Sequence, residues 1–205
     1  MFKRVFLQWV IATLALMFVV GCSSAGPSTK TNSVSQTAPP SLATETTDTT
    51  NDLLIKMKQL AEDGKVINST FYVKTTVMED VKSKWGEPDK SEWIAAAKGI
   101  YATYSKQAIV FGFNKGSQVF EVRSFDKQLQ KLSLAKTKEV YGTPALDVNV
   151  NGEKIIGYTA GQEFKMELVF PLPTAIDANP MMDHYLVLYP RGSVNNMAND
   201  PGRQW

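Results

Sequence analysis

The residue types that most often carry catalysis and metal binding are scarce in this chain of 205 residues, which has one histidine, His184, and one cysteine, Cys22. A zinc site of His and Cys ligands needs three or four of them. A Ser-His-Asp site would have to use His184, but Asp183 is too close in sequence to orient its ring easily, and no serine lies in a nucleophile-elbow pattern. We therefore expect no metal and no cofactor, and we interpret His184 as a solvent-facing residue at the start of a strand.

Paired carboxylates are the remaining route to catalysis, because glycoside hydrolysis needs two of them roughly 5–9.5 Å apart. The candidates are Glu79, Asp80, Glu87, Asp89, Glu121, Glu163 and Glu167. Glu79 and Asp80 suit the positive end of a helix dipole, and Glu163 and Glu167 alternate with apolar residues of a predicted strand. These contexts are typical of a surface, so we assign no catalytic residue and expect that the chain is not an enzyme.

Cys22 follows a segment that has the parts of a bacterial export signal. Lys3 and Arg4 precede an apolar run from Val5 to Val20, and Gly21 supplies a small residue before the cysteine. The end of this segment resembles the lipobox of bacterial lipoproteins, in which the cysteine is lipidated and becomes the new N-terminus.

We therefore predict a signal peptide at residues 1–21 and acyl chains such as palmitate on Cys22, which anchor the chain to the outer face of the cell membrane. Stable anchoring takes two or more such chains. The alternative is an uncleaved N-terminal anchor helix, although the apolar run is shorter than the roughly 20 residues that span a bilayer. Lipidation of Cys22 leaves no thiol for a disulfide or for cysteine catalysis.

The charge of the mature chain argues against nucleic acid as a partner. Loss of Lys3 and Arg4 with the signal lowers the formal net charge from +2 to zero. A neutral domain has no long-range field that would gather polyanions. Residues 22–50 are rich in Ser, Thr, Pro and Ala, a composition that predicts a disordered tether, and the globular domain is expected over residues 51–205.

Helix signals recur along the globular part. Asn51 or Asp52 can cap a first helix that stops at Gly64. Thr76 and Glu79 form a capping-box pattern ahead of a second helix, and Ser133 can cap a third. The second and third helices end at Trp85-Gly86-Glu87-Pro88 and Tyr141-Gly142-Thr143-Pro144, which lie 56 residues apart.

Strand-like segments rich in β-branched and aromatic residues follow each Gly-x-Pro stop. They cover residues 100–104, 108–113 and 118–125 after the first stop, and 146–150, 154–159, 163–170 and 184–189 after the second. Asn151-Gly152 favours a type I′ hairpin turn. We therefore predict an α+β fold in which an N-terminal helix precedes two helix–Gly-x-Pro–antiparallel-sheet units, at about 75–127 and 131–190, that share a core; two unrelated helix ends are the alternative.

Several of these segments together resemble the YjgB-like family of Bacillus-type lipoproteins, which is defined by a domain of unknown function. The segments are Thr76 to Lys90, Lys98 to Tyr104, Phe111 to Gly116 and Val122 to Phe125. The resemblance covers roughly Leu53 to Met197 and implies no catalytic residue. In architecture alone, the paired units resemble the β-lactamase inhibitor protein and small envelope lipoproteins of the BamE type, which are binding proteins; fold does not fix function.

Trp93 is the residue that we single out for ligand or partner binding. It lies between the polar run Asp89–Glu92 and the segment Ala95–Gly99, which suggests a loop, where binding residues concentrate. The alternative is a tryptophan that tucks under that loop as part of the core.

Three functions are consistent with the sequence. The first is a tethered binding or adaptor module that engages an envelope protein or a wall polymer through a concave sheet face. The second is an inhibitor of a hydrolase. The third is a carboxylate-based wall hydrolase.

Overall fold

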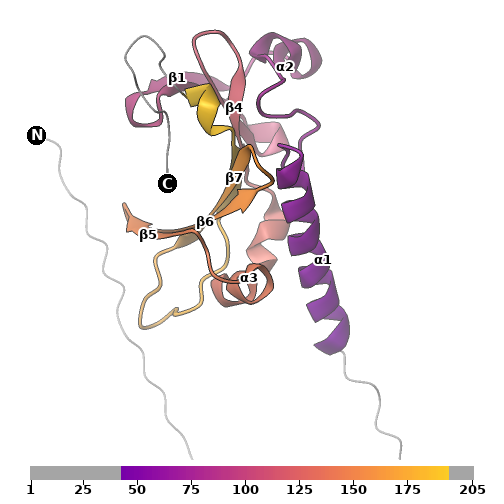
Figure 1. Cartoon of the computed structure of the whole chain (residues 1–205), viewed down its shortest axis with the longest axis vertical. Coiled ribbons are helices and arrows are strands. Elements are labelled where there is room, and N and C mark those ends of the chain that lie inside the picture. The colour runs from indigo at the N-terminus through magenta and orange to yellow at the C-terminus, as the bar shows by residue number, and fades with distance from the viewer. Residues whose placement is uncertain (1–42, 194–205) are drawn as a thin grey trace, which may run out of the picture. The chain divides into compact units, whose positions relative to one another are not determined.

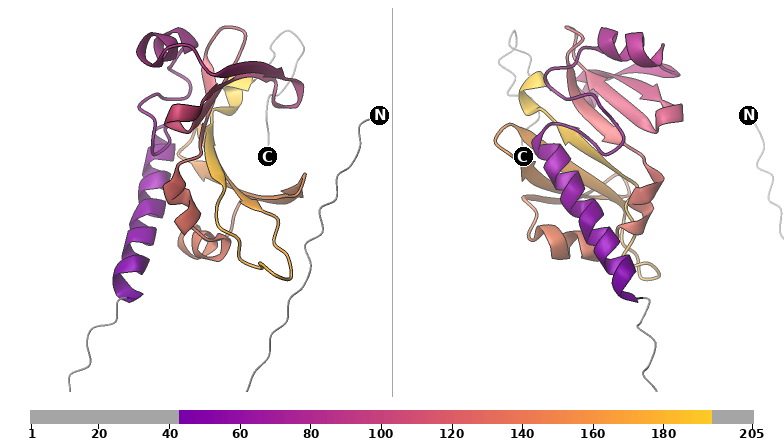
Figure 2. Two further views of the ribbon diagram at one scale, coloured as in Figure 1. Left: turned by 180° about the vertical axis from the view of Figure 1, so that it is seen from behind. Right: turned by 90° about the vertical axis from the view of Figure 1, so that its right-hand side faces the viewer.

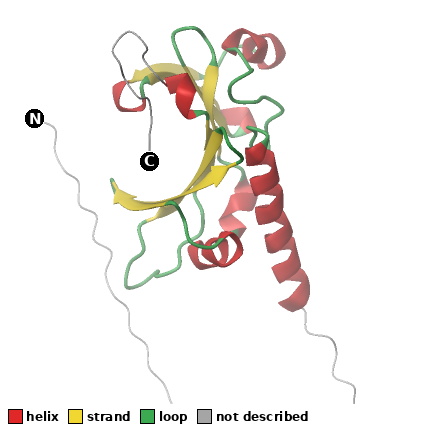
Figure 3. Cartoon of the chain, viewed as in Figure 1, coloured by secondary structure: helices red, strands yellow, loops and turns green. Residues whose placement is uncertain are grey.

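The computed structural model describes residues 43–193 of the chain (Figure 1). The predicted signal peptide, Cys22 and the predicted tether up to residue 42 lie outside the described residues. Within the described part the fold is α+β, as predicted, with three α-helices and one antiparallel sheet of eight strands (Figure 3). No helix of this part is long and apolar enough to cross a membrane.

The sheet is continuous, and its centre is formed by strands that are far apart in sequence. The strands are β1 (Lys90–Ile94), β2 (Gly99–Tyr104), β3 (Ile109–Phe113), β4 (Val119–Ser124), β5 (Leu146–Val150), β6 (Glu153–Ala160), β7 (Phe164–Pro171) and β8 (His184–Leu188). Their spatial order is β1-β2-β3-β4-β8-β7-β6-β5. Four strands therefore follow helix α2 (Met78–Trp85) and four follow helix α3 (Leu134–Tyr141), and β4 and β8, the last strand of each set, pair in the middle.

Helix α1 (Ala43–Glu62) begins earlier than the sequence suggested, ahead of the expected cap at Asn51 or Asp52. Its second half is anchored by Leu54, Met57 and Ala61, which are fully buried. Once a helix is anchored in this way, each added residue gains a hydrogen bond without the cost of a new nucleus. Residues 43–50, whose composition predicts disorder in an isolated segment, can therefore extend a helix that is packed against the core. The predicted stop is confirmed, since Gly64 has φ +77°.

The two shorter helices begin differently from each other. The predicted capping box of α2 (Met78–Trp85) does not form: Thr76 accepts from the Tyr72 amide and Glu79 accepts from the Ser117 hydroxyl. At α3 (Leu134–Tyr141) the predicted cap is present, because the Lys136 amide donates to Ser133 Oγ at 3.2 Å. The Asn151-Gly152 turn between β5 and β6 is also confirmed, with φ +52° and +84°.

All three α-helices lie on the convex side of the curved sheet, and α1 runs across several strands there (Figure 2). The main core fills the space between them. It joins helix residues such as Leu54, Val81 and Leu134 to the sheet residues Phe111, Val122, Ile156, Leu168 and Val187. A second, smaller cluster comprises Tyr101, Phe120, Leu186 and Leu188. Among residues 43–193, the opposite, concave face carries no α-helix (Figure 2).

Candidate functional site

The concave face carries a row of side chains that crosses six strands. Directly opposed residues of antiparallel strands share a face, so the register places one residue of each strand in this row. Its members, in order from β2 to β6, are Tyr101, Gly112, Glu121, Leu188, Lys165 and Thr159. We call this set the concave row. Arg123 and Glu167 lie in the adjacent row of the same face, on either side of Leu186.

Glu121 is the centre of a hydrogen-bonded network in the concave row. Its side chain is fully buried. Its Oε2 accepts a hydrogen bond of 3.1 Å from the Tyr101 hydroxyl, and its Oε1 accepts one from Arg123 Nε. The guanidinium carbon of Arg123 lies 4.8 Å from the centroid of the Tyr101 ring, within the range of a cation–π contact. The three side chains therefore hold one another in a closed triangle.

Gly112 makes this triangle possible. It lies on β3, between Tyr101 on β2 and Glu121 on β4. A Cβ at position 112 would lie 2.9 Å from Cε1 of Tyr101 and 3.1 Å from Cβ of Glu121. The absent side chain lets the tyrosine ring lie across β3 and reach the carboxylate two strands away.

A buried charge network on a sheet face is not the cheapest way to stabilise a fold. Removing each ion from water costs several kcal/mol, and apolar replacements of similar volume are often as stable or more so. Glu167, on the same face, is also buried, with 7% of its surface exposed. Two buried carboxylates, the Arg123 guanidinium and Lys165 give this face the chemistry to bind a polar ligand.

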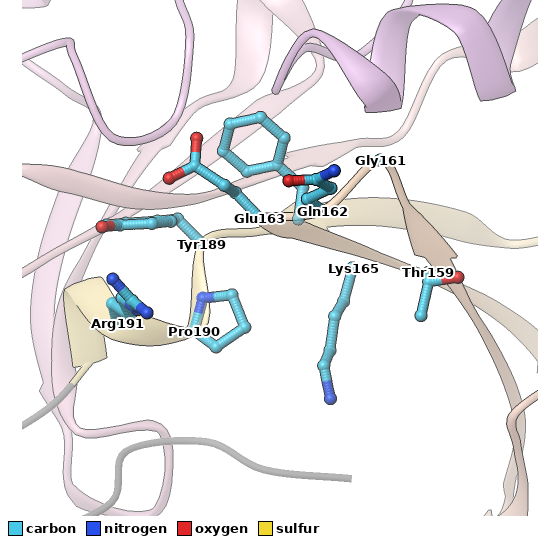
Figure 4. Close-up of a pocket in the computed structure, with 9 residues that line it drawn as sticks. Thr159, Gly161, Gln162, Glu163, Lys165, Tyr189, Pro190 and Arg191 are labelled. Atoms are coloured by element: carbon cyan, nitrogen blue, oxygen red, sulfur yellow. The ribbon is translucent and has the colours of Figure 1, made fainter.

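A depression of about 490 Å³ adjoins the concave row at the start of β7 (Figure 4). It is lined by Thr159, Gly161, Gln162, Glu163, Phe164, Lys165, Tyr189, Pro190 and Arg191. Lys165 and Thr159 belong both to this lining and to the concave row. The two features are therefore parts of one surface.

Ionic contacts shape the depression. Lys74 Nζ lies 2.8 Å from each carboxylate oxygen of Glu163, and this hydrogen-bonded contact raises the pKa of the Lys74 amine. Burial lowers the pKa of Lys165, and the Glu167 carboxylate opposes that shift. The exposed guanidinium of Arg191, in the short 3-10 helix η4 (Pro190–Ser193), completes the charged lining.

The structure places Trp93 away from the concave row. The residue lies on β1, the edge strand, and 53% of its surface is exposed. It pairs with Ile100, which pairs with Phe113, and Phe113 packs against the main core on the helix side. The predicted loop is wrong, because Lys90–Ile94 forms the edge strand β1. The sequence did not indicate a strand, because most of its residues are polar and have low β propensity. Neither does Trp93 tuck into the core; its role in binding stays a prediction.

His184 differs from its expected solvent-facing position. Only 7% of its surface is exposed, and its ring stacks on Phe125 with centroids 4.6 Å apart. Asp183 Oδ2 lies 2.7 Å from His184 Nδ1, so the adjacent carboxylate does orient the ring, contrary to the argument from sequence.

The predicted carboxylates divide into two groups. Glu79, Asp80, Glu87, Asp89 and Glu163 are exposed, as their sequence contexts suggested. Glu121 and Glu167 are buried on the concave face. The alternation of polar and apolar residues could not predict this burial, because it does not show whether the polar face of a strand is exposed to water. Among residues 43–193, no group of three or more His, Cys, Asp or Glu side chains is placed to hold a metal ion.

Comparisons with known proteins support the family resemblance. The family model for a domain of unknown function, DUF4309, matches residues 54–188, a range that contains all eight strands. Among solved structures, the chain is similar to a DUF4309 family protein, YjgB, from Bacillus subtilis subsp. subtilis str. 168. The identity is 14%, the TM-score is 0.51, and the match covers 69% of this chain and 99% of that one; it shows the fold alone. A search of curated proteins found no match.

Proposed function

Because this chain belongs to the DUF4309 family, whose function is unknown, we propose from its own geometry that it is an extracytoplasmic binding module. The family match confirms the domain of unknown function that the sequence resemblance implied, whereas the lipoprotein character stays a proposal. In this proposal Cys22 carries the lipid that anchors the chain to the cell membrane, and the concave face of the sheet holds an envelope protein or a wall polymer. The module binds its partner without catalysis.

The observation that carries this proposal is the triangle of Tyr101, Glu121 and Arg123. It lies on the sheet face opposite the helices, and it uses a glycine and a desolvated carboxylate to hold one guanidinium in place. Such preorganisation reduces the cost of ordering side chains when a ligand binds. Concave surfaces with a few fixed polar groups are the usual form of ligand sites.

Site-directed photo-crosslinking in intact cells tests the proposal. A photo-reactive amino acid at Thr103 and at Thr159 samples the two halves of the concave face. We expect each position to give the same adduct, and we expect Arg123→Gln to weaken both adducts because the charge held by the triangle is lost. Mass spectrometry of the adduct distinguishes a protein from a wall fragment.

The matched control is the same photo-reactive residue at Lys58, an exposed position of α1 on the helix side. It should give no such adduct. An adduct from Lys58 that equals those from the concave positions, or adducts that do not respond to Arg123→Gln, would rule out the concave face as the binding surface.

A protruding loop favours inhibition of a hydrolase as a second candidate. Residues 172–183 join β7 to β8 (Figure 1). The side chain of Ile176 in this loop is fully exposed. The Asp177 amide donates to Thr174 Oγ1 at 3.0 Å, and the Ala135 amide donates to Asn179 Oδ1 at 2.8 Å, which ties the loop to α3. An ordered loop with an apolar tip suits insertion into an active-site cleft, and the architectural analogy with the β-lactamase inhibitor protein points the same way.

The inhibitor and enzyme alternatives have separate tests. If the chain inhibits a wall hydrolase, Ile176→Asp should abolish the inhibition, whereas Ile55→Asp, at another exposed isoleucine, should not. If it is itself a carboxylate-based wall hydrolase, purified walls should be cleared by the protein and not by Glu167→Gln. Glu121 is the less suitable catalyst, because both of its oxygens already accept hydrogen bonds from side chains of the same chain.

We further propose that the two helix–sheet units arose as copies of one unit. The equivalent Gly86 and Gly142 amides donate to the Lys82 and Lys138 carbonyls, one helical turn back. Trp85 meets Tyr104 edge to face at 5.5 Å, and Tyr141 meets Tyr158 in the same way at 5.2 Å. The order of the eight strands supports the same interpretation.

A further inference from the structure

The depression beside the concave row has the size and the lining of a ligand site. Its volume of about 490 Å³ falls within the range of roughly 300–1,000 Å³ that is usual for small-molecule sites. Figure 4 shows Lys165 and Arg191 on either side of Pro190, with Tyr189 and Glu163 above them in this view. An elongated ligand on the concave face would reach this depression through Lys165 and Thr159.

Positive charge predominates in the depression. The Glu163 carboxylate is bound to Lys74, at 2.8 Å from both oxygens, so these two charges offset each other. Lys165 and Arg191 are the other charged residues of the lining. Glu167, two residues along β7, neutralises part of the Lys165 charge, and Arg191 leaves the site cationic.

The backbone that carries Arg191 is held in place by the fold. The η4 helix that carries Arg191 packs against β4 so closely that a Cβ on Gly192 would lie 2.4 Å from Cβ of Phe120. Asn114 Nδ2 donates to the Gly192 carbonyl at 3.1 Å. Because this backbone is fixed, no backbone ordering at Arg191 is needed when a ligand binds.

Lys74 adds a sign of functional constraint. It has φ +78°, a left-handed conformation that is costly for a residue with a side chain, and such strain concentrates at functional sites. The conformation is stabilised because its amide donates to the Val119 carbonyl and its carbonyl accepts from Gln118 Nε2, each at 2.8 Å. Lys74, the strained residue, neutralises the Glu163 carboxylate. The net charge of the lining therefore stays positive.

We infer that this depression binds an oxyanion, a phosphate or carboxylate group, of a polymeric ligand that lies along the concave face. The inference rests on the proposed function and adds the chemical class of the ligand to it. Arg191 would bind the oxyanion with paired N–H donors, a geometry that planar guanidinium groups favour, and Lys165 would contribute a second charge at the junction with the concave row.

Calorimetric titration of the full-length chain in neutral detergent micelles tests the inference. One arm uses poly(glycerol phosphate) and the other uses poly(glutamate) of matched length, which distinguishes a phosphodiester from a carboxylate source. We expect one of them to bind, with affinity that falls as salt rises. Arg191→Gln should weaken that binding by about tenfold, because it removes the charge-assisted hydrogen bonds to the oxyanion, and adding Lys165→Gln should weaken it further.

The matched control is Lys58→Gln, which removes one positive charge from α1 and should leave the titration unchanged. Arg191 is exposed, so its variant should keep the melting temperature of the parent chain. Binding that survives in Arg191→Gln/Lys165→Gln overturns the inference, and so does a failure of the parent chain to bind either polymer.

The crosslinking experiment separates this failure from that of the proposed function. If neither polymer binds but the adducts at Thr103 and Thr159 persist and respond to Arg123→Gln, the concave face binds a ligand that is not an oxyanion polymer. If those adducts are absent as well, both proposals are wrong.

Discussion

The hydroxyl of Tyr104 donates a hydrogen bond of 3.0 Å to the carbonyl oxygen of Gly86, and so ties the second strand of the sheet to the end of α2. Tyr158 and Gly142 repeat this contact at 3.0 Å in the second half of the chain. Both glycines have positive φ, +87° and +77°, a conformation that glycine adopts without the steric cost of a Cβ. The glycine of each Gly-x-Pro sequence thus ends a helix. Its carbonyl oxygen also accepts a hydrogen bond from a tyrosine of the sheet.

Tyr104→Phe and Tyr158→Phe should each lower the free energy of unfolding by about 1 kcal/mol, because each removes one hydrogen bond and keeps the ring. Urea denaturation measures the change, and the double variant should show the sum of the two. Tyr72→Phe, at a ring that is 40% exposed, is the control and should leave stability nearly unchanged. A loss in only one of the two variants would count against equivalent roles for the two contacts.

Much of the fold could be predicted from periodicity and from turn residues. Strands such as Leu146–Val150 and the turn at Asn151-Gly152 follow from β-branched runs and from the positive φ that Asn-Gly tolerates. Strand β1 could not be found in this way, because an edge strand needs few apolar residues and Lys90–Ile94 has a polar majority. The pairing of β4 with β8 is likewise a long-range tertiary contact, which local sequence patterns do not predict.

Gly112→Ala should destabilise the chain by about 1–3 kcal/mol, the usual cost of overpacking. The new methyl group would meet the Tyr101 ring at 2.9 Å and push its hydroxyl away from Glu121. Gly116→Ala is the matched control, because the nearest atom to its added Cβ would lie 3.4 Å away. Thermal unfolding compares the two; an equal loss in both would show that the approach of Tyr101 across β3 is not what requires Gly112.

Arg123→Leu should cost about 3–5 kcal/mol, since it leaves the fully buried Glu121 carboxylate without its cation. Arg123→Leu/Glu121→Leu should recover most of that loss, because the uncompensated charge is gone. A double-mutant cycle by chemical denaturation measures the coupling. Should the double variant prove no more stable than Arg123→Leu alone, the ion pair would not be the source of the loss.

The candidate site was less accessible to sequence reasoning than the fold was. Glu121 and Glu167 alternate with apolar residues, as surface residues of a half-buried sheet do, and nothing local distinguishes them from Glu163. Their burial depends on tertiary contacts, such as those of Tyr101 and Arg123 with Glu121. Gly112 gave no turn signal, and its role appears only when Tyr101 is seen to lie across it.

Alkaline pH should unfold the chain partly through Tyr158. Burial, with a smaller contribution from the Asp147 carboxylate, raises the pKa of this phenol to about 12, above the ordinary value near 10. The neutral phenol is therefore favoured by the folded state, and its contribution is complete below about pH 10 and lost as the pH rises to about 12. Unfolding curves collected across this range should show a shallower decline in Tyr158→Phe than in the parent; identical slopes would contradict the assignment.

Cys22→Ser should release the globular part from membrane fractions or leave the precursor uncleaved. The thiol carries the diacylglyceryl group in the proposed anchor, and each buried CH₂ contributes about 0.8 kcal/mol to membrane binding, so its loss removes the whole of that energy. Fractionation and immunoblotting separate the two outcomes by location and size. Ser23→Ala, at the next residue, should leave both unchanged. A Cys22→Ser product that is cleaved and still sediments with membranes would mean that another part of the chain holds it there, and lipid on Cys22 would no longer be needed to explain its location.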